Sequence, residues 1–307
     1  MRVIVSGATS MIGIACVRAY IASGCEVLAI VRKGTKRLAR LPESSLIKLA
    51  YADLDTMDSV QGDGKPYDVF YHFAWSHTSK EERDDPLAQE NNIRATLQAV
   101  QLAHRLGCRK FIGAGSQAEY GCIDGVITPD TPPQPIIAYG MAKLSSCMLS
   151  RRLCQHYGIQ HIWGRIFSVY GINDNAGTML NYAMDQFDHG EPAKFSAATQ
   201  LWNYLYEDDA GAMFYHLGEK HVEPGIYCIA HTESHPLRSY ILALQQIYGD
   251  GAVCEFAPVD HDVKLISLCV DIQKTVDAIG YVPQVSFPEG IGRILKARND
   301  KKGELQK

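Results

Sequence analysis

Tyr139 and Lys143 have the side chains and the spacing for acid–base chemistry. Residues four apart on a helix lie one above the other on the same face, so an ammonium would stand beside a phenol. The positive charge favours the phenolate and lowers a pKa that is ordinarily about 10. A shift of about 3 units, worth roughly 4 kcal/mol, would let Tyr139 exchange a proton with a substrate oxygen at neutral pH. The same spacing also occurs on solvated helix faces, so the hypothesis depends on the rest of the chain.

Ser116 could hold the same substrate oxygen through its hydroxyl group. It follows a predicted strand over residues 109–113, and ligands of open α/β sheets bind at the carboxyl ends of the strands. Trp75 and His77 come directly after another predicted strand, over residues 67–74, and would lie at the same edge. These three residues are therefore candidates for contact with a substrate.

Three neighbouring features are predicted to have no part in binding. His72 lies inside a predicted strand and is expected to be a packed core residue. The charged segment over residues 80–85 is predicted to be a solvated face. The short polar tail over residues 299–307 is expected to be frayed.

A glycine-rich turn near the start of the chain is a candidate phosphate site. A predicted strand over residues 2–6 leads directly into it, and a helical pattern follows as far as about Ser23. Glycine lets the backbone come close to a pyrophosphate, and the first turn of a helix offers unpaired N–H groups. A plain tight turn is the alternative interpretation. The candidate cofactor residues here are Gly7, Thr9, Ser10, Met11, Ile12 and Gly13.

The second predicted strand, over residues 26–31, ends in a basic segment that contains Arg32, Lys33, Lys36 and Arg37 but no acid. An NAD site has an acid at this position for the ribose 2′-hydroxyl, whereas an NADP site has cations for the 2′-phosphate. The segment therefore favours NADP(H), with Arg32 as the first ligand and Arg37 as the second. A solvated basic loop and an NAD(H) site are the alternatives.

Asp53, followed by Leu54, comes after a third predicted strand over residues 46–50. Its carboxylate could accept a hydrogen bond from the adenine amino group. It could equally bond to its own backbone in a turn.

The order of the predicted elements indicates an α/β protein with a Rossmann-type doubly wound parallel sheet. Strands and helices alternate through residues 1–168, which we assign to a dinucleotide-binding domain. Residues 169–307 are less regular and are predicted to form mainly a smaller, interleaved substrate-binding region, with some elements returning to the sheet. The elements expected there are helices over residues 178–189, 208–218 and 237–248 and strands over residues 193–195 and 225–229.

The composition excludes several classes of protein. The chain has 307 residues, of which 46% are hydrophobic and 21% charged, as in ordinary globular proteins. A net charge of −4 gives no general affinity for nucleic acid or for an anionic membrane. The nine scattered cysteines indicate free thiols in a reducing compartment. We therefore expect a cytoplasmic protein without a membrane span, a signal peptide or a bound metal.

Taken together, the motifs resemble those of the extended short-chain dehydrogenase/reductase family, also called the NAD-dependent epimerase/dehydratase family. The resemblance implies that Tyr139 is the general acid/base and that Lys143 holds the nicotinamide ribose and lowers the tyrosine pKa. It implies that Ser116 binds the carbonyl oxygen, that the substrate is a nucleotide-linked sugar, and that helices 87–106 and 139–157 pair in a homodimer. The matching segments are residues 6–13, Asp53-Leu54, Tyr71-His72-Phe73-Ala74, residues 92–96, Ser116, Tyr120-Gly121, Tyr139, Lys143 and residues 165–171.

Four departures from the family pattern bear on the cofactor turn, the substrate or the reaction. Ser10 replaces the middle glycine of the turn, and Ser168 replaces an asparagine that often touches the sugar nucleotide. Trp202 stands where many epimerases of the family have an arginine on the substrate phosphates. Gln117 and its neighbour Ala118 occupy the positions of the acid pair that a dehydratase needs. Arg238 and Lys264 are the candidates to replace the missing phosphate ligand.

Trp75, Trp202 and residues 115–119 make the chain more similar to 4-ketoreductases of CDP- or dTDP-linked 6-deoxyhexoses than to UDP-galactose epimerases. The first hypothesis is therefore an NADPH-dependent reductase of a nucleotide-linked 4-keto-6-deoxyhexose. The alternative is a nucleotide-sugar 4-epimerase that retains NAD⁺. A third hypothesis, a cofactor-binding regulator without catalysis, is disfavoured because Ser116, Tyr139 and Lys143 are all kept.

Overall fold

The computed structural model describes residues 1–79, 81–260 and 265–305 and contains one large sheet. Its seven strands run in the order β11-β6-β5-β4-β1-β2-β3, and every neighbouring pair is parallel. The predicted fold class is therefore confirmed. The chain reverses its winding between β1 and β4, and ligands of such sheets bind at that point. The strands are β1 (Arg2–Ser6), β2 (Glu26–Val31), β3 (Ile47–Tyr51), β4 (Val69–His72), β5 (Lys110–Ser116), β6 (Gln160–Ile166) and β11 (Gly225–Ile229).

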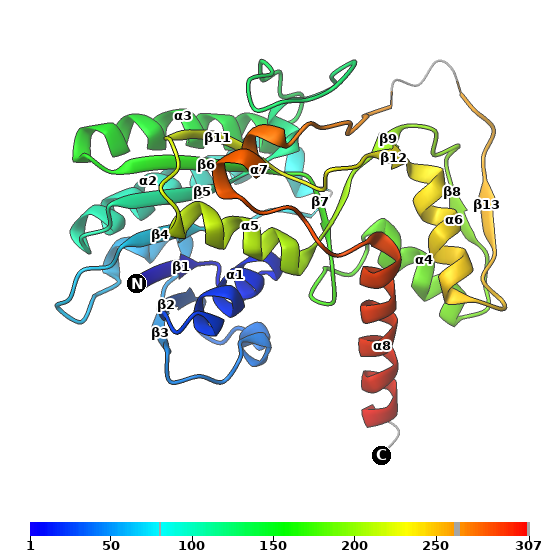
Figure 1. The fold of residues 1–307 in the computed structure, drawn as a ribbon, viewed down its shortest axis with the longest axis horizontal. Helices are drawn as coiled ribbons and strands as arrows, with labels where there is room; N and C mark the ends of the chain where they lie inside the picture. The colour runs from blue at the N-terminus through cyan, green and yellow to red at the C-terminus, as the bar shows by residue number, and fades with distance from the viewer. Residues whose placement is uncertain (80, 261–264, 306–307) are drawn as a thin grey trace.

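Helices cover both faces of the sheet (Figure 1). Helices α1 (Met11–Ala22) and α5 (Glu207–Glu219) pack together on one face, and α2 (Pro86–Arg105) and α3 (Ala138–Tyr157) on the other. Side chains alternate along a strand, so β1 contributes to two cores. Val3 and Val5 pack in the core under α1 and α5, whereas Ile4 packs in the core under α2 and α3. Both faces of the central strands are buried, as a parallel sheet requires.

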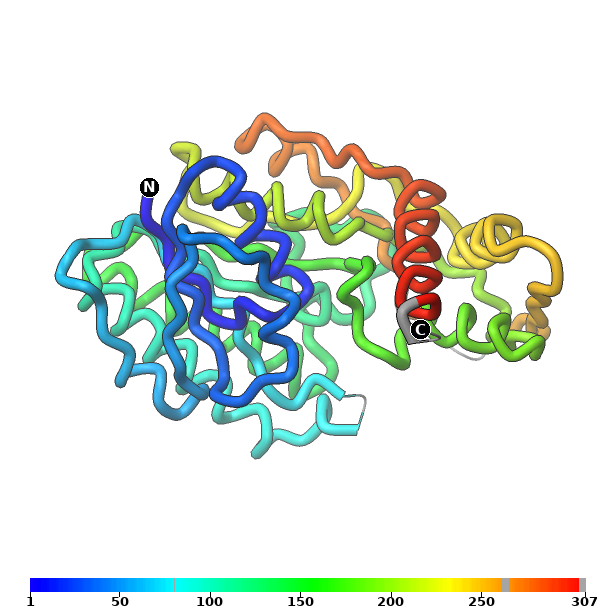
Figure 2. The backbone as a smooth tube through the Cα atoms, turned by 90° about the horizontal axis from the view of Figure 1, so that it is seen from below, coloured from blue at the N-terminus to red at the C-terminus, as the bar shows by residue number. Residues whose placement is uncertain are grey.

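A smaller part lies beyond the carboxyl edge of the sheet. Figure 2 shows α4 and α6 at the end of the molecule far from the N-terminus, with α8 (red) between them and the sheet. Helix α5 and strand β11 return from this part of the chain to the sheet, while the division at residue 168 stays a prediction. The elements are α4 (Met179–Asp188), α6 (Leu237–Tyr248), α7 (Gln273–Ile279), α8 (Phe287–Leu305) and the paired strands β7 (Ser168–Tyr170) with β10 (Tyr204–Tyr206), β8 (Ala193–Phe195) with β13 (Cys254–Phe256), and β9 (Leu201–Trp202) with β12 (His235–Pro236).

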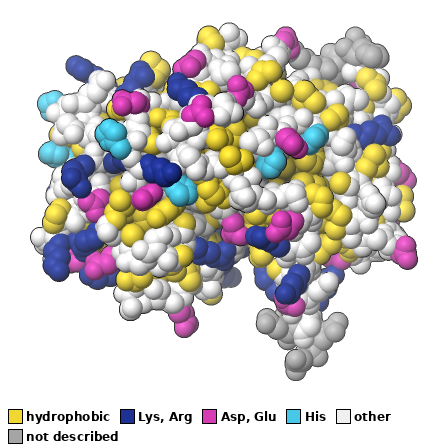
Figure 3. Space-filling model, in the orientation of Figure 1, with side chains coloured by type: hydrophobic (Ala, Val, Ile, Leu, Met, Phe, Trp, Pro, Cys, Tyr) yellow, Lys and Arg dark blue, Asp and Glu magenta, His cyan; other side chains and the backbone are white. Residues whose placement is uncertain are grey.

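Helix α8 continues to Leu305, so the expectation of a frayed tail is wrong for residues 299–305. The last turns are held by ion pairs to the end of α4. Arg298 lies 2.8 Å and Lys302 2.7 Å from the carboxylate of Asp188. In Figure 3 the lower end of α8 projects from the molecule, and charged side chains of both signs are interspersed over the face shown.

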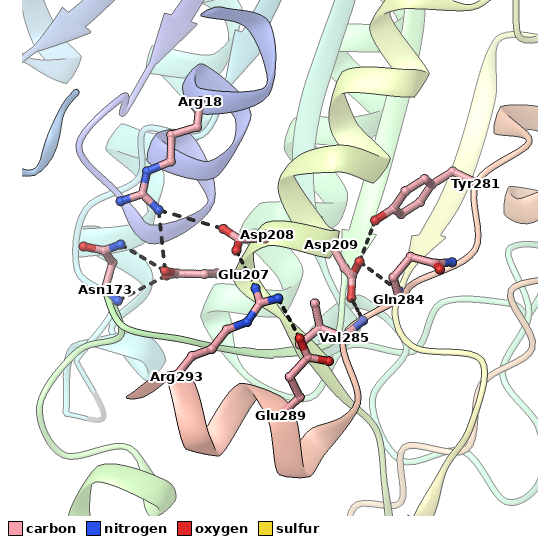
Figure 4. A network of polar contacts seen from close by, with 10 residues as sticks. All are labelled: Arg18, Asn173, Glu207, Asp208, Asp209, Tyr281, Gln284, Val285, Glu289 and Arg293. Carbon is pink, nitrogen blue, oxygen red and sulfur yellow. Dashed lines mark hydrogen bonds and ion pairs between the residues drawn. The ribbon is translucent and has the colours of Figure 1, made fainter. Parts of the chain in front are cut away.

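The start of α5 joins the two parts of the molecule (Figure 4). Its first turn carries three acids, which complement the positive end of the helix dipole. Glu207 accepts hydrogen bonds from the backbone and side chain of Asn173, and Asp208 forms an ion pair of 3.1 Å with Arg293 of α8. Asp209 binds the segment that leads into α8. The cofactor side of the sheet is thus tied to the smaller part through one helix terminus.

No helix in the described part of the chain is both long and apolar enough to cross a membrane.

Candidate active site

The glycine-rich turn lies between β1 and α1, against the end of β4. Gly7 has φ +70°, and a Cβ on it would lie 2.6 Å from the backbone nitrogen of Ala74, so only glycine fits there. Ser10 is the N-cap of α1, and its hydroxyl accepts the Gly13 N–H at 3.1 Å. Serine in place of the family glycine therefore adds a helix cap. The first turn of a helix offers N–H groups without intrahelical partners, and α1 begins at the carboxyl edge of the sheet, which fits a pyrophosphate.

A basic hollow of about 460 Å³ lies beyond the end of β2. Arg32 and Arg37 both line it and are both exposed. The guanidinium of Arg37 donates a hydrogen bond of 2.9 Å to the side chain of Asn175. Asp53 lines the same hollow at the end of β3, and its backbone N–H bonds to the Thr56 hydroxyl at 3.0 Å. The hollow thus gathers cations and one acid where an adenosine ribose would need them. Leu54, the neighbour of Asp53, packs against the core under α2 and α3.

The loop after β4 is held by side chains of α2. The Ser76 N–H donates to Asn92 at 2.8 Å, and the Gln89 amide donates to the His77 carbonyl at 2.8 Å. The Trp75 indole N–H donates to Gln89 at 3.0 Å, which fixes the ring at the carboxyl edge of the sheet. Phe73 and Ala74 precede it, against the turn that carries Gly7.

The structure brings Ser116, Trp75, Tyr139 and Lys143 together. Ser116 ends β5, and its hydroxyl accepts the Ala118 N–H at 3.2 Å. Tyr139 is the second residue of α3, and its ring lies 5.9 Å edge-on from the Trp75 ring. The Lys143 ammonium donates to the Ala114 carbonyl at 2.6 Å and lies 3.6 Å from the centroid of Trp75. The predicted catalytic set is therefore grouped at the end of β5, although its roles stay predictions.

The electrostatics of Tyr139 differ from the expectation. Burial raises the pKa of its phenol, and the opposing influences are the charge of Arg83 and a side-chain hydrogen bond with Ser116. The Lys143 ammonium is bonded to the Ala114 carbonyl and lies 5.7 Å from the Tyr139 ring centroid, so its effect on the pKa of Tyr139 stays a prediction. Burial lowers the pKa of Lys143 itself to about 7.

Two further residues contact the predicted catalytic set without having been predicted from the sequence. Arg83 lies in the charged segment predicted to be a solvated face, but it is half-buried with its guanidinium carbon 4.3 Å from the Tyr139 ring centroid. That prediction is wrong for Arg83. Asp85-Pro86 is a typical helix start, and it could have indicated that residues 82–84 form a turn directly before a helix.

The other missed residue, Glu119, is fully buried beneath the site. It accepts hydrogen bonds from the Ser116 N–H and the Trp163 indole, both at 2.9 Å, and from Arg165 at 2.8 Å. Gly115 lies under the same indole, where a Cβ would be 2.2 Å from its nitrogen.

His72 is also buried, and its ring contacts the hydroxyls of Ser6 and Thr96, at 2.8 and 3.2 Å. Its prediction as a core residue is therefore confirmed.

The remaining substrate candidates are dispersed. Gln117 is half-exposed in the 3₁₀ turn η4 (Gln117–Glu119), next to Ser116. Ser168 on β7 and Trp202 on β9 belong to separate short strands. The Arg238 guanidinium stacks on Phe256 at 4.0 Å. Lys264 lies outside the described residues.

Comparison with known proteins agrees with this geometry. The sequence model of the NAD dependent epimerase/dehydratase family matches residues 3–230. The chain is 23% identical over 226 residues to dTDP-4-dehydro-6-deoxyglucose reductase of Escherichia coli, and the match covers 72% of this chain and 71% of the reductase. It is 27% identical over 175 residues to UDP-glucose 4-epimerase of Streptococcus mutans, covering 56% of this chain and about half, 53%, of that one.

Among solved structures, UDP-glucuronic acid 4-epimerase from Bacillus cereus in complex with NAD superimposes with a TM-score of 0.84. The two chains are 23% identical, and the match covers 99% of this chain and 98% of the other. At this identity the likeness shows the shared fold alone.

Proposed function

The chain belongs to the NAD-dependent epimerase/dehydratase family, and from this we propose that it is an NADPH-dependent reductase of a nucleotide-linked 4-keto-6-deoxyhexose. Enzymes of this family act on nucleotide sugars. The observation that carries the choice of a reductase is the basic hollow at the end of β2, which contains Arg32 and Arg37. Cations there fit the 2′-phosphate of NADPH, which donates reducing equivalents in net reductions. The likeness to the Escherichia coli reductase over 72% of the chain supports the same choice.

The described residues fit such a cofactor. The turn from Gly7 to Gly13 would bind the pyrophosphate, the basic hollow the adenosine end, and Lys143 the nicotinamide ribose. When bound, the dihydronicotinamide supplies a hydride to C4 of the sugar. Phe73 and Ala74, at the end of β4, would border the cofactor on the side of the glycine-rich turn.

Tyr139 and Ser116 would act on the oxygen at C4. The Ser116 hydroxyl donates a hydrogen bond to the carbonyl oxygen and orients it. Tyr139 gives its phenolic proton to that oxygen as the C=O double bond becomes a single bond, and the phenolate then takes a proton from solvent. The products are an alcohol and the oxidised cofactor, so one hydride and one proton are consumed in each turnover.

The direct test is NADPH consumption with CDP- and dTDP-4-keto-6-deoxyglucose, with NADH alongside. We expect rapid oxidation of NADPH with one of the two sugars, at least about tenfold faster than with NADH, because a charged contact to the 2′-phosphate is worth about 1.5–3 kcal/mol. Arg32→Ser should raise KM for NADPH and leave KM for NADH unchanged, so NADH serves as the internal control. Tyr139→Phe should lower kcat by about 100-fold or more.

The second candidate is an NAD-dependent nucleotide-sugar 4-epimerase. It is favoured by the likeness to UDP-glucose 4-epimerase of Streptococcus mutans. An epimerase oxidises and re-reduces the same carbon, so it consumes no reduced cofactor. Absence of NADPH oxidation, together with NAD⁺ released from the purified protein on denaturation, would replace the reductase by the epimerase.

The proposal includes a cytoplasmic homodimer. Cytoplasmic location is supported by the nine cysteines, all of which are free thiols. The homodimer is supported by an apolar hollow between α2 and α3, lined by Leu97, Leu149, Arg152, Leu153, Gln155 and His156.

A further inference from the structure

The short 3₁₀ turn η3 (Glu82–Asp84) connects the substrate edge of the sheet to two helices. The Asp85 carboxylate caps α2 by accepting the N–H groups of Leu87 and Ala88, at 2.9 and 3.2 Å. The Asp84 carboxylate accepts the N–H of Ala138, the first residue of α3, at 2.9 Å. Helix α3 has no side-chain cap of its own, because Ile137 precedes it. The turn is therefore fixed against the residue that directly precedes Tyr139.

Arg83 projects from this turn onto the ring of Tyr139. Its guanidinium carbon lies 4.3 Å from the ring centroid, within the range of a cation–π contact. Its Nε is buried and has no hydrogen-bond partner within the described parts of the chain. A buried donor without a partner costs about 1–3 kcal/mol. Among the described residues, the contact with the Tyr139 ring is the side-chain interaction found for Arg83.

Lys143 is the other cation at the site, and its ammonium lies 5.7 Å from the Tyr139 ring centroid. Its ammonium is bonded to the Ala114 carbonyl and lies on the face of Trp75. Burial lowers the pKa of Lys143 to about 7. The Arg83 guanidinium carbon, 4.3 Å from the same ring centroid, is the nearer of the two cations to Tyr139.

We propose that Arg83 is a positioning residue that holds the ring of Tyr139 and stabilises its phenolate form. The proposal rests on the role of Tyr139 as the proton donor in the proposed function. The charged and polar groups that face Tyr139 come from four elements: Arg83 from η3, Ser116 from β5, Glu119 from η4 and Lys143 from α3. Burial and the charge of Glu119 raise the pKa of Tyr139, and Arg83 opposes both.

The first test measures the ionisation of residue 139 directly and needs neither cofactor nor substrate. A trifluorinated tyrosine, which ionises at lower pH than tyrosine, is installed at position 139, and its fluorine chemical shift is followed against pH. We expect Arg83→Met to raise the apparent pKa of this residue by about one unit or more, because an opposite charge at this range lowers a pKa by about 1–3 units. Arg83→Lys should restore part of the shift.

Arg94→Met is the matched control, because Arg94 is an exposed arginine on α2 that pairs with Glu90 at the surface. It should leave the titration unchanged. Equal apparent pKa values of the fluorinated residue in the wild-type chain and in Arg83→Met would overturn the proposal, whichever reaction the enzyme proves to catalyse. A cooperative thermal unfolding transition close to that of wild type shows that each variant is folded.

The second test is the pH profile of kcat/KM for the reductase reaction. Tyr139 must be protonated to act, so activity falls above its pKa in the free enzyme. Arg83→Met should move this alkaline limb to higher pH by about one unit and lower kcat more than it raises KM. If Arg83→Met lowered the activity without moving the alkaline limb of the pH profile, Arg83 would have a structural or substrate-binding role instead, and the proposal would be wrong.

Discussion

Glu119 and Arg165 form a buried ion pair beneath Ser116, with exposed fractions of 0% and 1%. One carboxylate oxygen of Glu119 accepts the Ser116 and Trp163 N–H groups, and the other accepts Arg165. The Arg165 guanidinium also lies 4.3 Å from the ring of Tyr120. Because the charges are enclosed, neither can be removed alone without leaving the other uncompensated.

Glu119→Gln should destabilise the protein by about 3–5 kcal/mol, because it leaves the Arg165 charge buried without a partner. Urea unfolding of the single variant and of the double variant Glu119→Gln/Arg165→Met measures the cost. The double variant should recover much of the loss, since it removes both charges. A single variant within about 1 kcal/mol of wild type would show that the pair is not buried in solution.

His72 gives the protein a dependence of stability on pH. Burial lowers its pKa to about 3, and its two ring nitrogens contact the hydroxyls of Ser6 and Thr96. The unfolded chain has the ordinary value of about 6.5. Between about pH 3 and pH 6.5 the unfolded chain binds one more proton at His72 than the folded chain does. The contribution of neutral His72 to the free energy of unfolding is therefore fully present above about pH 6.5 and falls as the pH is lowered.

Lowering the pH from 7 to 5 should therefore cost about 2 kcal/mol through His72. His161 adds a similar amount, because burial lowers its pKa to about 3 as well. The free energy of unfolding at the two pH values, measured for wild type and for His72→Asn, separates the contributions. The pH-dependent loss should be smaller by about 2 kcal/mol in the variant; an equal loss in both proteins would refute the assignment.

The N-terminus of α5 is the element that joins the cofactor side to the smaller part. Asp209, which is 1% exposed, accepts the Tyr281 hydroxyl at 2.5 Å and the backbone N–H groups of Gln284 and Val285 at 2.9 and 2.8 Å. These three bonds fix the segment that leads into α8 (Figure 4). Its neighbour Asp208 is half-exposed and makes ion pairs with Arg18 and Arg293.

Asp209→Asn should destabilise the protein by about 2 kcal/mol or more, because an amide turns one acceptor into a donor that faces buried donors. Asp208→Asn is the matched control one residue away, with an expected cost of about 0.5 kcal/mol for exposed ion pairs. Thermal unfolding and limited proteolysis near residues 281–286 report the two effects. Equal behaviour of the two variants would mean that α5 does not anchor this segment.

The sheet of the whole molecule follows from local patterns in the sequence. The glycine-rich turn after β1 and the alternation of strands and helices specify a doubly wound fold without any knowledge of contacts. Helices α4, α5 and α6 match their predicted ranges to within one residue at each end, and β8 and β11 match theirs. Each of these elements has its own apolar pattern, and such patterns are visible in the chain alone.

The sequence does not indicate which distant segments pair with one another. Strand β8 pairs with β13 and β9 with β12, and nothing within either segment indicates its partner. The same holds for the site. Arg83 reaches Tyr139 through the fold, and the Lys143 ammonium also contacts Ala114 and Trp75, which its spacing from Tyr139 does not indicate. Electrostatics in a packed site depend on such contacts rather than on sequence spacing.

The outer surface of α2 and α3 indicates how two whole molecules would associate. Met148 and Leu149 are 54% and 49% exposed on α3, beside the apolar hollow that both helices line. A second copy placed on these helices by a two-fold axis would cover the same residues on each chain.

Light scattering after gel filtration should therefore give twice the chain mass of 34.0 kDa. Leu149→Glu should shift the mass to that of the monomer, because it buries an unpaired charge. Leu242→Glu, at a similarly exposed leucine on α6, should leave the dimer intact. A wild-type mass of one chain, or equal behaviour of the two variants, would rule out this interface.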